Sequence, residues 1–104
     1  MMNRKSLTIE TRILKYFLTP TLDKQVVILP KNADILHFGE DEEDTICLWA
    51  RVVPEREKEA RIFKIFPTGS YISKEDDATA VYQDTVITRS FVMHVYEMIG
   101  LVEK

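Results

Sequence analysis

Two histidines are the side chains of this sequence best suited to acid–base or ligand chemistry near neutral pH. His94 lies in the apolar run FVMHVYEMIG, and His37 lies in ILHFG. A catalytic histidine also needs a nucleophile and an orienting partner within hydrogen-bond reach, and no sequence pattern identifies either. We therefore expect His94 to be a structural residue whose ring nitrogens meet a backbone carbonyl or a cross-strand hydroxyl. We expect His37 to be an exposed histidine at a strand end.

The spacing of the ligand-type residues matches no metal or cofactor motif. The histidines have neither H-x-H nor H-x-x-x-H spacing, and the acidic run 40–44 lacks the D-x-D-x-D-G register of a calcium loop. No glycine-rich phosphate loop occurs in the sequence. The single cysteine, Cys47, has apolar and acidic neighbours, so we expect a buried, unreactive thiol. We predict no catalytic residue, no metal site and no cofactor, and we expect the protein not to be an enzyme.

Trp49 and Arg51 alternate along one extended run, so they would share one face of a strand. A tryptophan beside an arginine can hold a flat ligand such as a nucleobase. Together with His94, this pair is our candidate ligand site between sheet or subunit faces, for a protein that sequesters a small nucleotide-like signal. The competing interpretation is ordinary packing, in which Arg51 extends its charged head into water.

Acidic residues gather in two short segments of a chain whose net charge is −3. If these segments adjoin in the fold, their charge would steer a basic protein surface toward them. Separate solvated loops are the competing interpretation. The candidate partner-binding residues are Glu40, Asp41, Glu42, Glu43, Asp44, Glu75, Asp76 and Asp77. The sequence contains no basic cluster interleaved with aromatic residues, so we expect no nucleic-acid binding.

The elements that must position these residues are short extended runs separated by turn signals. The runs are rich in β-branched and aromatic residues and cover 12–18, 24–30, 33–39, 45–53, 60–66, 78–89 and 90–100. The segment PEREKEAR could form a helix, but it has no apolar face, so we expect an exposed hairpin loop or a single solvated turn. The pattern predicts a mainly β fold, either a small antiparallel sandwich or a partly open barrel. We expect six to seven short strands and at most one short helix.

A length of 104 residues is typical of one domain. We expect residues 1–11 to form a loosely ordered N-terminal segment and residues 12–104 to form a single β-rich domain. No apolar run is long enough to cross a membrane, and no secretory signal opens the chain, so we expect a cytoplasmic protein without membrane contact. Unpaired strand edges would also favour a homodimer. The predicted core consists of Ile13, Phe17, Val26, Ile28, Ile35, Leu48, Ala50, Phe63, Ile65, Val86, Phe91, Met93 and Val95.

Several segments together resemble a family of short, uncharacterised phage and prophage proteins. These segments read ICLWARV, RIFKIFPTGSYI, VYQDTV and FVMHVYE, in that order. They resemble the C-L-W-A element, the T-G turn and the closing H-V-F-E-like strand of that family, although Met93 stands where the family often has tryptophan. The resemblance covers residues 12–98. It implies an accessory protein made in an infected bacterial cell, and it carries no activity over to this chain.

Our leading hypothesis is a non-catalytic protein that binds and modulates a bacterial host protein, for host takeover or counter-defence. It would act in the cytoplasm of the host. The acidic segments and the phage-like setting motivate this hypothesis. The first alternative is the protein that sequesters a small molecule, and the second is a minor component of the virion or of its assembly.

Overall fold

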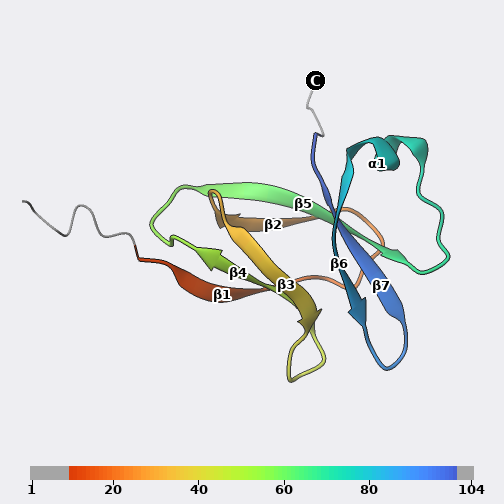
Figure 1. The fold of residues 1–104 in the computed structure, drawn as a ribbon, viewed down its shortest axis with the longest axis horizontal. Coiled ribbons are helices and arrows are strands. Elements are labelled where there is room, and N and C mark those ends of the chain that lie inside the picture. Colours follow the sequence, from red (N-terminus) through yellow and green to blue (C-terminus); the bar gives the residue numbers. More distant parts are fainter. Residues whose placement is uncertain (1–9, 101–104) are drawn as a thin grey trace, which may run out of the picture.

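The computed structural model describes residues 10–100, and their chain forms two antiparallel β-sheets and one short helix (Figure 1). The strands are β1 (Arg12–Phe17), β2 (Gln25–Pro30), β3 (Asp34–Glu40), β4 (Ile46–Val52), β5 (Lys58–Pro67), β6 (Ala80–Ile87) and β7 (Val92–Met98), and the helix is α1 (Lys74–Thr79). The sheets have the strand orders β1-β4-β3 and β2-β5-β7-β6. The predicted mainly β fold is confirmed as a small sandwich. Most of the N-terminal segment predicted at residues 1–11 lies outside the described residues.

The core lies between the two sheets and is built by strict alternation along their central strands. Ile46, Leu48, Ala50 and Val52 of β4 face inward, as do Met93 and Val95 of β7. The rings of Phe38 and Phe63 meet edge to face across the two layers, with centroids 5.7 Å apart. This arrangement is favoured by the aromatic quadrupole and buries both rings completely or nearly so.

In β1 and β2 the inward face is the opposite of the predicted one. Ile13, Phe17, Val26 and Ile28 are exposed, as is Phe91. The inward positions of the two strands are Leu14, Tyr16, Val27 and Leu29. Both strands are outermost in their sheets and carry apolar residues on both faces, so alternation alone cannot identify the inner face. Register decides it, because Leu14 and Tyr16 lie opposite the inward residues Ala50 and Leu48.

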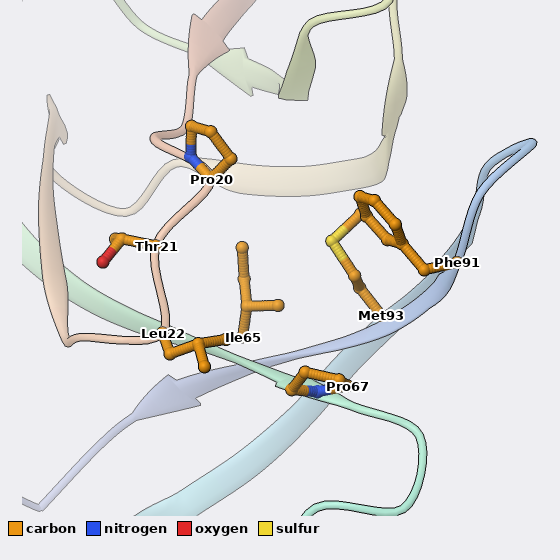
Figure 2. A pocket seen from close by; sticks show the side chains of 7 residues that line it. All are labelled: Pro20, Thr21, Leu22, Ile65, Pro67, Phe91 and Met93. Carbon is orange, nitrogen blue, oxygen red and sulfur yellow. The ribbon is translucent and has the colours of Figure 1, made fainter.

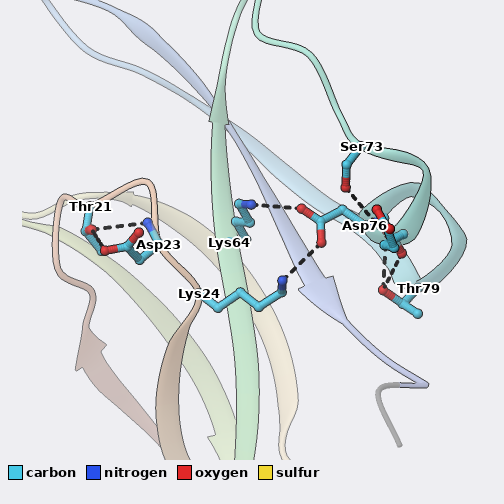
Figure 3. Close-up of polar contacts among 8 residues, drawn as sticks. Thr21, Asp23, Lys24, Lys64, Ser73, Asp76 and Thr79 are labelled. Atoms are coloured by element: carbon cyan, nitrogen blue, oxygen red, sulfur yellow. Dashed lines mark hydrogen bonds and ion pairs between the residues drawn. The ribbon is translucent and has the colours of Figure 1, made fainter.

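The helix α1 occupies a segment that we predicted to be an acidic loop. Ser73 caps it, because its hydroxyl accepts a hydrogen bond from the backbone N–H of Asp76 over 3.1 Å. The buried carboxylate of Asp76 then binds Lys64 at 2.8 Å and Lys24 at 3.0 Å (Figure 3). These two lysines, Lys64 foremost, lower the pKa of Asp76. Asp76 therefore fastens α1 to the four-stranded sheet.

Residues 53–57 form a largely exposed turn, which is one of the two expected forms, and residues 58–61 of the PEREKEAR segment instead begin β5. The strands that this turn joins, β4 and β5, belong to different sheets. The chain therefore crosses from one layer to the other here. Within residues 10–100, no helix has the length and apolar character that a membrane crossing requires.

One ion pair lies on the inner face of the four-stranded sheet. Arg61 donates from Nε to Glu97 at 2.7 Å and from Nη2 to the other carboxylate oxygen at 2.8 Å. Its remaining Nη1 donates to the carbonyl of Ala33 at 2.9 Å. Glu97 is buried, and this bidentate pair gives both of its carboxylate oxygens a hydrogen-bond partner at the edge of the core.

Candidate functional site

His94 is held between two threonine hydroxyls on the outer face of the four-stranded sheet. Its Nδ1 lies 3.1 Å from the hydroxyl of Thr85, which stands directly opposite on β6. Its Nε2 lies 2.8 Å from the hydroxyl of Thr68. The chain of hydroxyls continues to Tyr82, 2.6 Å from Thr85. The expected cross-strand hydroxyl partner of His94 is therefore present, and both ring nitrogens have a hydrogen-bond partner.

The candidate ligand residues do not meet within one chain. Trp49 and Arg51 point away from the core on β4, which places them on the outer face of the three-stranded sheet. His94 points away from the core on β7, in the other layer. The core therefore separates His94 from the other two residues, so the three residues line no shared cavity within one chain.

His37 is exposed, as expected, but it lies within β3 and not at its end. Its ring stacks on Trp49, with centroids 5.8 Å apart. Its Nδ1 lies 3.2 Å from a carboxylate oxygen of Asp84, and the same oxygen accepts a hydrogen bond from the N–H of Phe38 over 3.0 Å. Asp84 therefore joins the edge strand β6 to the edge strand β3 of the other sheet. We did not predict this role from the sequence, because it depends on a β-bulge between Tyr82 and Asp84.

The acidic hairpin, residues 40–44 between β3 and β4, is held in shape by one of its own carboxylates. Asp41 accepts hydrogen bonds from the N–H groups of Glu43 and Thr45, over 2.9 and 3.0 Å. Its second oxygen binds Lys15 at 3.0 Å. The N–H of Thr45, then Lys15, then the N–H of Glu43 lower the pKa of Asp41, and the bond to Asp41 raises the pKa of Lys15. Asp41 is thus a structural residue.

The other four acids of the hairpin, Glu40, Glu42, Glu43 and Asp44, are exposed to solvent. Asp44 adopts a left-handed backbone conformation, with φ of 62°. The N–H of Asp44 donates to the carbonyl of Asp41, and the N–H of Asp41 donates to the carbonyl of Thr45. The loop is therefore closed by hydrogen bonds in addition to those of the Asp41 side chain. It presents a cluster of carboxylates from a defined backbone.

The second acidic segment, Glu75 to Asp77, lies in α1 and does not adjoin the hairpin. Figure 1 shows α1 at the top of the view and the loop between β3 and β4 at the bottom. Asp76 also faces the sheet, where it is paired with two lysines. The two segments therefore do not form the single acidic patch that would steer one partner. Of the eight predicted partner-binding residues, four are exposed on the hairpin and two, Glu75 and Asp77, are exposed on α1. The hairpin therefore carries the larger group of exposed acids.

Two hollows lie beside the turn between β6 and β7. The polar hollow, of about 490 Å³, separates the hairpin from the turn between β6 and β7 and is lined by Glu40, Asp44, Thr88, Arg89, Ser90 and Phe91. The apolar pocket, of about 230 Å³, opens between the sheets and is lined by Pro20, Thr21, Leu22, Ile65, Pro67, Phe91 and Met93 (Figure 2). Phe91 lines both hollows. We did not predict either from the sequence, because their walls come from segments far apart along the chain.

Cys47 is fully buried on the outer side of β4, as expected. Burial raises the pKa of its thiol, with the nearby carboxylate of Asp41 acting in the same direction. Both effects keep the thiol protonated, which is the less nucleophilic form. Among residues 10–100, no group of three or more histidine, cysteine or acidic side chains has a geometry that could hold a metal ion.

The comparisons with known proteins give a family without a described activity. No curated protein and no solved structure matches this chain. Residues 9–103 match the model of a family described as a domain of unknown function, DUF7352. The match spans both sheets, the helix and the acidic hairpin. The chain therefore belongs to the DUF7352 family.

Proposed function

We propose that this protein is a non-catalytic accessory protein that binds and modulates a protein of a bacterial host through the acidic hairpin. The observation that carries the proposal is that Asp41 orders the loop on which the other acids are exposed. The carboxylate of this residue is hydrogen-bonded to the backbone of the loop and paired with Lys15, while the four acids around it remain exposed. The resemblance to phage proteins supports the bacterial setting.

A rigid acidic loop is suited to recognising a basic surface for two physical reasons. First, a loop that is already ordered loses little conformational entropy when a partner binds. Second, exposed carboxylates of one sign accelerate encounter with a basic partner and repel acidic competitors. Lys15 forms its ion pair with Asp41 and also attracts Glu42, so the four exposed acids still outnumber this one lysine.

The test is charge reversal at the tip of the hairpin. The tagged double variant Glu42→Lys/Glu43→Lys is compared with wild type for proteins retained from bacterial lysate, as quantified by mass spectrometry. Glu55→Lys/Glu57→Lys is the matched control, because it makes the same change in net charge in the exposed connection at the other end of β4. We expect the hairpin variant to retain about tenfold less of the main partner than wild type does, or less still. The control should retain as much as wild type.

The dependence of partner retention on salt concentration tests the same electrostatic mechanism in a second way. Retention by wild type should weaken as ionic strength rises, because the Debye length shortens to about 3 Å at 1 M salt. Circular dichroism of each variant checks that the fold is intact. Equal retention by wild type and the hairpin variant, with both folded, would contradict a role for the acidic hairpin.

A further inference from the structure

The apolar pocket leaves large hydrophobic side chains in contact with water, and it shares Phe91 with the polar hollow that lies beside the acidic hairpin. Its floor consists of the core residues Ile65 and Met93, and its mouth is formed by Leu22 and Phe91, which are 61% and 51% exposed. Figure 2 shows the side chains of Ile65 and Met93 between the Pro20–Leu22 segment and Phe91. Water in contact with such a surface is released favourably when an apolar group enters.

The size of the pocket matches a single side chain. Its volume of about 230 Å³ lies below the range of about 300–1,000 Å³ that is usual for pockets of drug-sized ligands. Two of its walls are the prolines Pro20 and Pro67, whose φ angles are restricted. The backbone at these two walls is therefore restricted before a partner binds.

The charge next to the pocket specifies what flanks that side chain. Phe91 separates the apolar pocket from the polar hollow, where Glu40 and Asp44 face Arg89. Glu42 and Glu43 add two exposed carboxylates to the same hairpin. The acids of the hairpin outnumber this one arginine, so a group placed over the polar hollow meets a negative potential. A lysine or arginine is attracted there, and an acidic residue is repelled.

We infer that the partner presents a bulky apolar side chain directly next to lysine or arginine. The apolar side chain fills the apolar pocket, and the basic residues lie over the polar hollow and the acidic hairpin. This inference rests on the proposed function and deepens it, because it names the chemistry of the partner segment. An apolar side chain without basic neighbours and a purely basic segment are the other occupants that the experiment separates.

The experiment titrates the full chain with three capped peptides, followed by amide and methyl nuclear magnetic resonance. Their sequences are GGWKKGG, GGAKKGG and GGWEEGG. We expect GGWKKGG to bind about tenfold more tightly than GGAKKGG, since burial of a large apolar side chain is worth about one tenfold factor or more. We expect it also to exceed GGWEEGG, by a factor that shrinks as salt is added. Its shifts should include the methyl groups of Leu22, Ile65 and Met93 and the amides of the hairpin.

Two variants locate the contact. Leu22→Ala removes part of the pocket mouth and should weaken GGWKKGG about threefold or more. Ile13→Ala is the matched control, because Ile13 is 62% exposed, almost as much as Leu22, but lies in β1 away from the pocket. It should leave the affinity unchanged.

The outcomes separate this inference from the proposed function. Equal affinity of GGWKKGG and GGAKKGG, with shifts in the hairpin, overturns the inference and leaves the proposed function standing. Equal affinity of GGWKKGG and GGWEEGG, with shifts in the pocket alone, overturns the inference and also counts against the acidic hairpin. No shift from any peptide at millimolar concentration overturns the inference, while the lysate capture still decides the proposed function.

Discussion

Replacing Glu97 by methionine should remove a large part of the stability of this protein, because it leaves the guanidinium of Arg61 inside the sandwich without its carboxylate. In the native structure, Glu97 accepts two charge-assisted hydrogen bonds from Arg61, over 2.7 and 2.8 Å. Removing one partner of a buried ion pair costs about 3–5 kcal/mol. The Arg61 side chain is 19% exposed, so water offsets part of this loss, and we expect about 2–4 kcal/mol.

Urea unfolding, followed by circular dichroism and by the fluorescence of Trp49, measures this loss as a change in midpoint at constant slope. Arg61→Met should destabilise to a similar extent, because it orphans the carboxylate of Glu97. The double variant should lose only about 1 kcal/mol, because no unpaired charge is left and the carbonyl of Ala33 has lost one donor. The coupling between the two sites should then be about 3 kcal/mol or more.

A surface ion pair provides the control for this cycle. Nζ of Lys31 lies 3.9 Å from Oε1 of Glu57, and both side chains are exposed. Glu57→Met should therefore change the unfolding free energy by less than about 1 kcal/mol. If the double variant at Arg61 and Glu97 were destabilised by the sum of the two single changes, the pair would be uncoupled. The reasoning from bidentate geometry and burial would then be refuted.

Three further predictions concern the hairpin and the histidines. The pKa of Asp41 is lowered, so its bonds stabilise the folded state fully above the ordinary carboxyl pKa of 3.8. This stabilisation is lost as the pH falls through the pKa of the folded state. Asp41→Asn should therefore make the unfolding free energy less dependent on pH in this range, as measured by acid unfolding. Thr85→Val should destabilise by about 0.5–1.5 kcal/mol in urea unfolding, because Nδ1 of His94 loses its hydroxyl partner. Gly39→Ala should change stability by less than about 1 kcal/mol. Its methyl group would lie 2.9 Å from Nε2 of His37, so the ring must move and its resonances should shift; unchanged resonances would contradict the placement.

The sequence by itself determined the fold class, because the signals for it are local. Strands β4 and β7 alternate between inward and outward residues so regularly that their core faces follow from the residue types alone. The cap of α1 was also a readable signal, since serine three positions before an acidic residue favours a helix start. We predicted a loop there because we interpreted the segment by its charge and did not use its capping pattern.

Only the tertiary structure decided which face of β1 and β2 is buried and which strands share a sheet. These features depend on pairing between segments far apart along the chain, and the alternation within one edge strand contains no information about its partner. The same reason explains the outcome for the candidate sites. Residue types identified Trp49, Arg51 and His94 as possible ligand groups, but the two layers place them on opposite outer faces. The apolar pocket arises where three distant segments converge, and that convergence exists only in the folded chain.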